Sequence, residues 1–181
     1  PIIGDIPVSL FFLILMQVAI LAYALVGGVF LAFSDFIMRS LSLTGGAGGV
    51  EVMQVINREV FRWIFMALFL GMAAVSLVIA GIGAITLSHP AGMLILIAGL
   101  VYLVGCFGVT VLFNVPMNEA LAGMELSEDA TRAYWKGTYL PRWTFWNTVR
   151  TLACGLSAAL LLSGLLWMIQ AQAVAPQAAA R

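Results

Sequence analysis

The residues best suited to chemistry are amides, indoles and one guanidinium, and they fall near the ends of two apolar segments. Asn114 and Asn118 are four residues apart, so on one helix their amides face the same side. A second helical arc carries Trp143, Trp146, Asn147 and Arg150. A pocket with apolar walls and a few polar anchors is the usual design of a small-molecule site. We therefore expect these side chains to line a site that binds a small molecule.

Charged and polar residues next to another apolar segment, at the same end of the predicted bundle, add to this predicted site. A single unbroken helix over this region would align four polar residues in one stripe: Glu51, Gln54, Arg58 and Arg62. Asn57 and Glu59 flank that stripe. Arg62 is a further candidate contact for the ligand, because such a stripe should face the bundle rather than lipid.

Each of these groups also has a structural interpretation. Trp, Tyr and Arg gather at membrane interfaces, where long basic side chains extend toward water. Asn residues commonly hold helices together through interhelical hydrogen bonds. Asp35 and Arg39, four residues apart on the first apolar segment, suit a structural ion pair. The residues alone leave binding and structural roles both open.

Composition indicates which elements position these side chains. The 181 residues are 63% hydrophobic and only 9% charged, which is too few polar groups to cover a water-soluble globule. Four apolar runs reach the roughly 20 residues that a helix needs to cross a hydrocarbon core. We predict one all-α transmembrane domain over residues 1–181, a four-helix bundle with spans at about 7–38, 51–88, 91–119 and 143–170. A short cytoplasmic helix from Ser127 to Lys136 should connect the last two spans, and 171–181 should form a flexible tail.

Basic residues predict the orientation of these spans. Four spans place both termini on one face, and only Arg181 among the Lys and Arg residues lies there. The loops of the other face, with the span ends next to them, hold the rest: Arg39, Arg58, Arg62, Arg132, Lys136, Arg142 and Arg150. Basic residues near span ends prefer the cytoplasm. We therefore expect an integral protein of a bacterial inner membrane, in contact with membrane lipids, with both termini outside, on the periplasmic side.

Charge and cysteine content argue against several other classes. Formal net charge is zero, so we expect no nucleic-acid partner. His89 is the only histidine and is predicted at the opposite end from the polar residues, so no zinc or haem pattern is present. We expect no metal and no cofactor. Cys106 and Cys154 are interpreted as buried thiols, because a disulfide would require adjacent helices at matching depth.

Four motifs carry a resemblance to a known family: GGVF and SDF within 27–36, MQVINR at 53–58, FNVPMN at 113–118 and WTFWNTVRT at 143–151. Their order and spacing resemble the anthrone oxygenase-like family of small four-helix membrane proteins, over residues 27–152. The resemblance implies cofactor-independent oxidation of anthrones to anthraquinones by molecular oxygen. Many relatives carry His after the Trp-Asn pair, where this sequence has Thr148.

On this resemblance the residues take chemical roles. An anthrone is acidic at its methylene, and its enolate can pass an electron to oxygen without a metal. Glu59 or Asp35 would act as the base. Three residues would stabilise the phenolate and enolate oxygens: Arg150, Asn147 and Asn114. Trp143 and Trp146 would stack on the fused rings.

Two functions from different classes follow from these observations. The first is a membrane oxygenase-like oxidoreductase, or a related binder, that acts on a flat hydrophobic anthrone- or quinone-like molecule at the cytoplasmic end of the bundle. The second is a non-catalytic accessory subunit that stabilises other membrane protein subunits, with the polar cluster as internal glue. Thr148 favours the second function, whereas the gathering of amides, Arg and Trp at one level favours the first.

Overall fold

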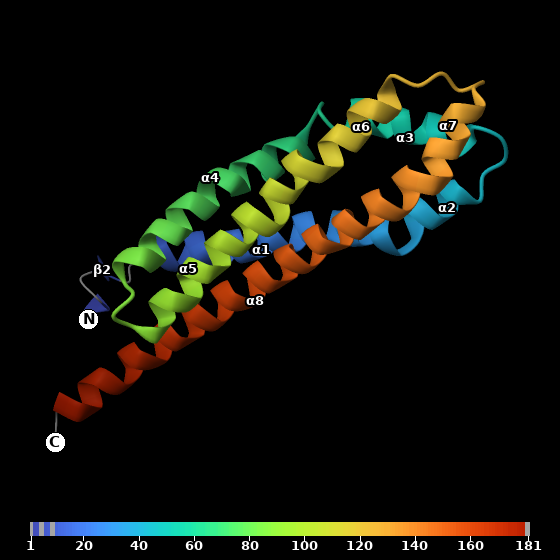
Figure 1. The fold of residues 1–181 in the computed structure, drawn as a ribbon. Coiled ribbons are helices and arrows are strands. Elements are labelled where there is room, and N and C mark those ends of the chain that lie inside the picture. The colour runs from blue at the N-terminus through green and yellow to red at the C-terminus, as the bar shows by residue number, and fades with distance from the viewer. Residues whose placement is uncertain (1, 4–5, 8–9, 180–181) are drawn as a thin grey trace.

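Four long helical rods make up most of the described part of the molecule. The computed structural model describes the backbone of residues 2–3, 6–7 and 10–179, and the side chains of residues 10–171. Four helices are long and apolar enough to cross a membrane, and they run side by side in Figure 1: Leu10–Ser42, Ile64–Ile85, Pro90–Ala122 and Asp129–Ala171. The predicted all-α fold with four membrane-spanning helices is confirmed.

The first rod is one helix with a local change of winding. α1 (Leu10–Ala32) leads into a π-helical turn, η1 (Phe33–Ile37), and then into α2 (Met38–Ser42). A pair of two-residue strands precedes it, with β1 (Ile2–Ile3) antiparallel to β2 (Ile6–Pro7). The predicted start of this span at residue 7 therefore falls within β2, three residues before the helix.

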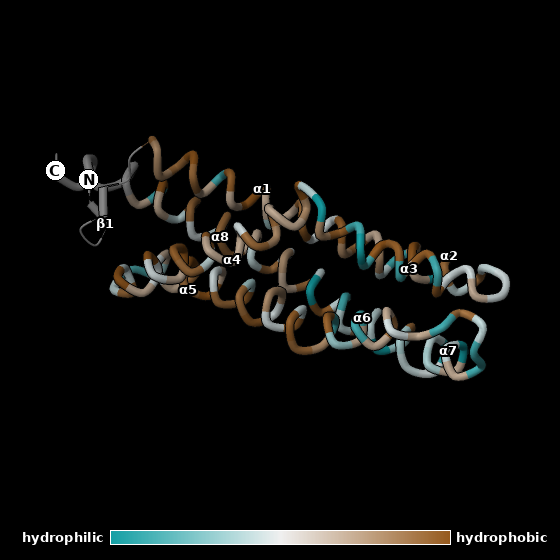
Figure 2. Tube along the Cα trace, turned by 90° about the horizontal axis from the view of Figure 1, so that it is seen from above, coloured by the Kyte–Doolittle hydropathy of each residue, from teal (hydrophilic) through white to brown (hydrophobic). Residues whose placement is uncertain are grey.

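The second rod starts later than predicted, because the chain breaks between α3 (Gly48–Glu59) and α4 (Ile64–Ile85). Trp63 has extended backbone angles, with φ −143° and ψ −152°, so no helix runs through it. α3 is amphipathic and lies beside α2 at the polar end of the bundle, whereas α4 is apolar on all sides and follows the other spans (Figure 2). One straight helix cannot satisfy both environments. The predicted continuous stripe from Glu51 to Arg62 is therefore wrong.

A close glycine contact sets the position of α3. A Cβ added at Gly49 would lie 2.2 Å from the carbonyl oxygen of Leu41, near the end of the first rod. In the preceding turn, Gly46 has φ +60°, which side chains other than glycine rarely adopt. The two glycines let α3 fold back against α2, which brings Met53 and Asn57 over the end of the bundle.

The third rod contains two π-helical stretches. It consists of α5 (Pro90–Tyr102), η2 (Leu103–Gly108), η3 (Thr110–Asn114) and α6 (Val115–Ala122). Pro90 occupies the first turn of α5, where its missing N–H has no helical partner to lose. A π-helical turn adds a residue per turn and so rotates the side chains that follow it.

The fourth rod absorbs the short helix that was predicted as a connector. α7 (Asp129–Tyr134) continues through a π-helical turn, η4 (Trp135–Tyr139), directly into α8 (Leu140–Ala179). The backbone of α8 is helical well into the predicted flexible tail, and residues 180–181, including Arg181, lie outside the described residues.

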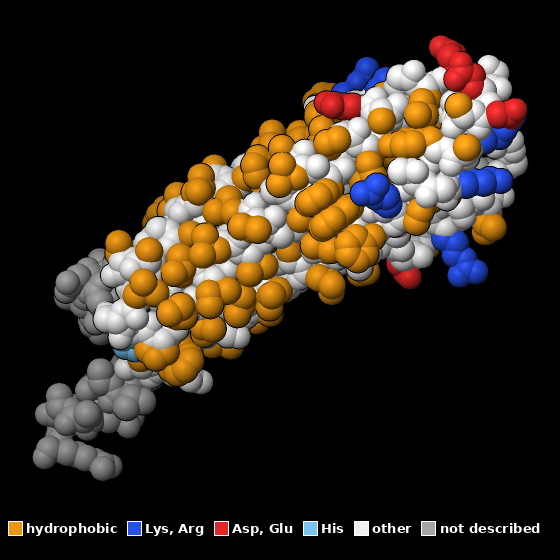
Figure 3. All heavy atoms as spheres, in the orientation of Figure 1, with side chains coloured by type: hydrophobic (Ala, Val, Ile, Leu, Met, Phe, Trp, Pro, Cys, Tyr) orange, Lys and Arg blue, Asp and Glu red, His pale blue; other side chains and the backbone are white. Residues whose placement is uncertain are grey.

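Packing is dense along the bundle axis, and apolar side chains cover its outside. α8 packs along α1 and α5, and α4 packs along α5 with fewer contacts to α1. Between a third and two fifths of each span is buried inside the protein, and the exposed remainder is largely aliphatic. Figure 3 shows this apolar surface, with Lys, Arg, Asp and Glu gathered over the end formed by α2, α3, α6 and α7. A lipid-facing surface with one polar end is the arrangement expected of a membrane protein.

Candidate functional site

A cavity of about 330 Å³ lies near the polar end, among the four rods and α3. Its walls are mainly aromatic and aliphatic side chains, among them Phe30, Phe33, Met53, Phe65, Phe69, Phe107 and Trp143. Four polar side chains interrupt these walls: Asn57, Thr110, Asn118 and Arg150. This volume is at the lower end of the range for small-molecule pockets, roughly 300–1,000 Å³. The cavity thus combines apolar walls with a few polar anchors, and Asn118, Trp143 and Arg150 are the predicted site residues that line it.

Arg150 is the dominant polar group of the cavity. The residue is only 5% exposed, and its guanidinium carbon lies 4.1 Å from the centre of the Phe30 ring and 5.3 Å from that of Trp143. Its Nη1 donates to Thr110 Oγ1 at 3.2 Å and its Nη2 to Asn147 Oδ1 at 2.6 Å. Its buried Nε has no hydrogen-bond partner. All of these contacts are to neutral groups.

Arg150 also lacks a carboxylate counterion within the described residues, where the ion pairs are Arg62–Glu59 and Arg132–Asp129. Buried arginines usually pair with an acid, because an uncompensated charge is costly to remove from water. A cation held by neutral groups and aromatic faces is therefore prepared to accept an anion.

Asn147 holds the guanidinium in place from the side of the first rod. It is fully buried, and its Nδ2 donates to the Phe30 carbonyl oxygen at 2.6 Å and to Ser34 Oγ at 2.7 Å. Ser34 Oγ is in turn 2.9 Å from Thr148 Oγ1. Asn147 therefore supports Arg150 without lining the cavity itself.

Asn118 and the residues around it form the outer polar wall. Its Oδ1 accepts hydrogen bonds from the Tyr139 hydroxyl at 2.7 Å and from the Trp143 indole at 2.8 Å. Asn57 Nδ2 reaches the same Tyr139 oxygen at 3.4 Å. These bonds join α3, α6, η4 and α8, and they orient the Trp143 ring that stands over Arg150.

Asn114 is close to this site but does not line the cavity. It is fully buried, and its Nδ2 donates to the Trp143 carbonyl oxygen at 3.2 Å, while its Oδ1 has no partner. Its contact ties η3 to the first turn of α8. The structure therefore gives Asn114 a positioning contact behind the cavity wall.

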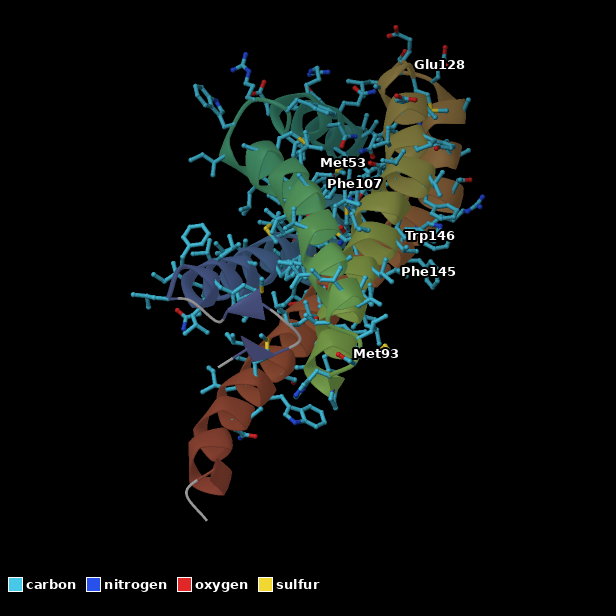
Figure 4. The ribbon with its side chains drawn as sticks, turned by 90° about the vertical axis from the view of Figure 1, so that its left-hand side faces the viewer. Met53, Met93, Phe107, Glu128, Phe145 and Trp146 are labelled. Atoms are coloured by element: carbon cyan, nitrogen blue, oxygen red, sulfur yellow. The ribbon has the colours of Figure 1, made fainter. Side chains whose placement is uncertain are left out.

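Four of the predicted site residues lie away from the cavity. Glu59 is exposed and pairs with Arg62 at 3.3 Å, and Asp35 is exposed as well. The predicted pair of Asp35 with Arg39 is not among the ion pairs of the described residues. Trp146 stacks on Phe113 with ring centres 3.7 Å apart, and Figure 4 shows it at the outer edge of the bundle. The arrangement thus provides no carboxylate and no histidine among the described cavity-lining residues.

The separation of Trp146 from Asn147 follows from helix geometry. Consecutive helical residues point about 100° apart, so these two lie on opposite edges of the arc that Trp143 and Arg150 define. The first rod packs on the Asn147 edge and η3 packs on the Trp146 edge. Only the centre of the arc faces the cavity.

Sequence reasoning missed most of the aromatic wall and Thr110. Phe65 and Phe69 share one face of α4 and stack with ring centres 6.3 Å apart, and Phe65 also meets Phe30 at 5.7 Å. Their four-residue spacing was a usable signal, because residues at that spacing are neighbours on a helix. The sequence around Thr110 did not indicate a functional residue, because single Thr residues are common within apolar helices.

The two cysteines meet one turn deeper than the cavity. Cys106 and Cys154 are free and fully buried, with their sulfur atoms 3.4 Å apart. Their helices are therefore adjacent and at matching depth, as a disulfide would require, but the chain holds two thiols here. They pack among the buried residues of the bundle, as the sequence predicts.

Comparison with known proteins supports the resemblance seen in the sequence motifs. A profile described as anthrone oxygenase matches residues 58–160, more than half of the chain. That range contains α4, the third rod, and the part of the fourth rod that carries Trp143, Asn147 and Arg150. Neither the curated proteins nor the solved structures gave a match. The chain belongs to the anthrone oxygenase family.

Proposed function

We propose that this protein is a membrane-embedded, anthrone oxygenase-like oxidoreductase. It binds a flat hydrophobic anthrone- or quinone-like molecule in the cavity, with an anionic oxygen of the ligand against Arg150. The observation that carries the proposal is a buried guanidinium, without a carboxylate partner among the described residues, on the wall of an aromatic cavity.

The charge of Arg150 favours the deprotonated form of such a ligand. A phenolate or enolate oxygen of the ligand would supply the counterion that the described residues do not provide. It would pair with the guanidinium of Arg150, which is buried away from water. Oriented donors that meet developing negative charge are commonly the largest single contribution to catalysis. Arg150 therefore supports formation of an enolate as well as ligand binding.

The shape and chemistry of the walls suit fused aromatic rings. Phe33, Phe65 and Trp143 present ring faces or edges to the cavity. Aromatic contacts of this kind add about 0.5–1.5 kcal/mol each beyond the area they bury. The amides of Asn57 and Asn118 could hydrogen bond with oxygens at the far side of the ligand.

The proposed reaction consumes one molecule of oxygen and needs no other oxidant. Water at the polar end of the cavity, beside Asn57 and Asn118, removes a methylene proton from the anthrone, because the cavity offers no carboxylate or histidine among its described lining residues. The enolate gives one electron to oxygen, and the radical and superoxide then combine through a new carbon–oxygen bond. The resulting peroxide takes up a proton. Loss of the second methylene proton with cleavage of the oxygen–oxygen bond yields the quinone carbonyl and water.

The ligand would enter from the membrane. Several residues that line the cavity are also exposed on the apolar surface, including Val29, Leu70 and Val111. This mouth lies on the sides of the rods, where acyl chains surround them. A hydrophobic substrate dissolved in the bilayer would therefore reach the cavity without crossing the aqueous phase.

Oxygen uptake tests the proposal directly. Purified protein in lipid nanodiscs would be supplied with an anthrone, and both oxygen consumption and quinone formation would be followed. We expect one oxygen consumed per quinone formed, and a loss of roughly 10²–10³ in turnover for Arg150→Gln. The exposed Arg142→Gln variant is the matched control and should retain activity. Uptake no faster than in protein-free nanodiscs would refute catalysis of this reaction.

A second function, a non-catalytic accessory subunit, is favoured by one specific observation. The described cavity lining holds no general base, and the Thr148 hydroxyl contacts Ser34 rather than the cavity. On this alternative the cavity binds a flat ligand or a partner side chain without turnover. Purification from the native membrane in mild detergent, with stoichiometric membrane subunits and no oxygen uptake, would support it over the oxygenase.

A further inference from the structure

A second depression lies on the surface between the first and fourth rods, at the polar end. Its volume is about 510 Å³, and it is open to the outside. Two cations, Arg39 and Lys136, are among its lining residues, together with the hydroxyls of Ser34, Ser42, Thr144 and Thr148. No carboxylate is among its described lining residues. We call this surface the α2–η4 groove.

The cations of the groove are available to a ligand. Neither Arg39 nor Lys136 takes part in the ion pairs of the described residues. Both are exposed, and they approach the groove from different rods, one from α2 and one from η4. Two cations that face one groove without an acid create a site of positive potential.

The position of the groove along the bundle axis places it at the membrane surface. α4 has 22 residues, which corresponds to ~33 Å, close to the roughly 30 Å of a hydrocarbon core. The polar end of that core therefore lies near the start of α4, where Phe65 contacts Phe30 of the first rod. Ser34 and Arg39 lie ~6 Å and ~13 Å further along that rod. The groove thus begins at the edge of the hydrocarbon and extends into the headgroup region.

An apolar surface continues from the groove toward the bilayer centre. Leu140, Pro141 and Phe145 line the groove itself, between Lys136 and Thr148 on the fourth rod, and Phe145 is 60% exposed. Further toward the centre, Leu31 of α1 and Leu152 of α8 are 54% and 67% exposed. Cations and hydroxyls at the headgroup level, above exposed aliphatic side chains, match the order of groups in a phospholipid. Basic pockets of this kind between transmembrane helices bind anionic headgroups.

We propose that the α2–η4 groove binds one anionic phospholipid. Its phosphate lies between Arg39 and Lys136, and its acyl chains run along α1 and α8. The inner end of the groove is the Ser34–Thr148 contact, and Ser34 also accepts from Asn147. The lipid would therefore lie against the residues that support Arg150.

Native mass spectrometry from nanodiscs tests this assignment. Nanodiscs of phosphatidylcholine mixed with phosphatidylglycerol would be used, and the lipids retained by the released protein would be counted. We expect the wild-type protein to retain one phosphatidylglycerol in preference to phosphatidylcholine. The Arg39→Gln/Lys136→Gln variant should bind it roughly 25-fold more weakly, at about 1 kcal/mol per cation.

The matched control removes the same charge elsewhere. Arg58 and Arg142 are exposed basic residues that do not line the groove, so Arg58→Gln/Arg142→Gln should retain phosphatidylglycerol. An equal loss in both double variants would mean that general surface charge holds the lipid, and the groove assignment would fall. Displacement of the lipid by free glycerol phosphate at similar affinity would also overturn it, in favour of a soluble anion. Because all four positions are exposed, circular dichroism should show unchanged helicity.

Discussion

The Nη2 atom of Arg150 donates to Asn147 Oδ1 at 2.6 Å, one turn apart on α8. The same Asn147 side chain donates to the Phe30 carbonyl oxygen of the first rod at 2.6 Å. A single buried amide therefore links the contact between two rods to the orientation of the only charged side chain described in the cavity lining. Helix packing and site geometry depend on each other at this point.

Removal of either neutral partner of Arg150 should weaken binding of an anionic ligand. Thr110→Val keeps the side-chain volume but removes the acceptor of Nη1, and we expect roughly tenfold weaker binding. Asn147→Ala should weaken ligand binding as well. It should also lower the unfolding free energy by about 1–3 kcal/mol, because it breaks the hydrogen bonds to the first rod. Equilibrium titration and thermal unfolding in detergent measure the two effects. Unchanged affinity for the anionic ligand in both variants would contradict the proposed role of Arg150 in ligand binding.

A bulky residue at the cavity mouth should block access without harming the fold. Val111 lines the cavity and is 48% exposed, so Val111→Trp can be accommodated on the lipid-facing side while its ring obstructs the mouth. We expect ligand binding at least roughly tenfold weaker, at an unchanged unfolding temperature. Val104→Trp is the control, because Val104 is on the same rod and 70% exposed but does not line the cavity. Equal effects of the two variants would argue against entry at this mouth.

Close packing of α4 on α5 should be sensitive to a single methyl group. A Cβ at Gly83 would lie 2.2 Å from the backbone nitrogen of Leu96, which cannot move without shifting α5. We expect Gly83→Ala to lower the unfolding free energy by about 1–3 kcal/mol. A Cβ at Gly81 meets nothing within 4 Å, so Gly81→Ala on the same helix should be nearly neutral. Thermal unfolding of both variants in one detergent checks this difference.

Orientation in the membrane can be measured with single cysteines. Cys106 and Cys154 are fully buried, so both should resist maleimides until the protein unfolds. Ser42 is exposed at the charged end, which we expect in the cytoplasm. Ser42→Cys should therefore react with a membrane-permeant maleimide in intact cells and not with an impermeant one. Labelling by the impermeant reagent would reverse the predicted orientation.

The sequence by itself determined the four membrane-spanning helices, the gathering of charge at one end, and the family. Each depends on information that is local in the chain. Hydropathy over about 20 residues predicts a span, because a helix satisfies its own backbone hydrogen bonds within the segment. The family motifs around Asn114 and Asn147 are likewise continuous stretches. The start of α5 at Pro90 was also predictable, since proline suits a first helical turn.

Only the tertiary structure decided which of the polar residues share a site. Glu59 and Arg62 were predicted near the ligand, but the break at Trp63 turns them to the surface. Trp146 and Asn147 are neighbours in the chain, yet one stacks on Phe113 and the other supports Arg150. The reason is physical: a helix fixes the direction of each side chain relative to its neighbours, whereas packing between rods and local π-helical turns fix what lies opposite.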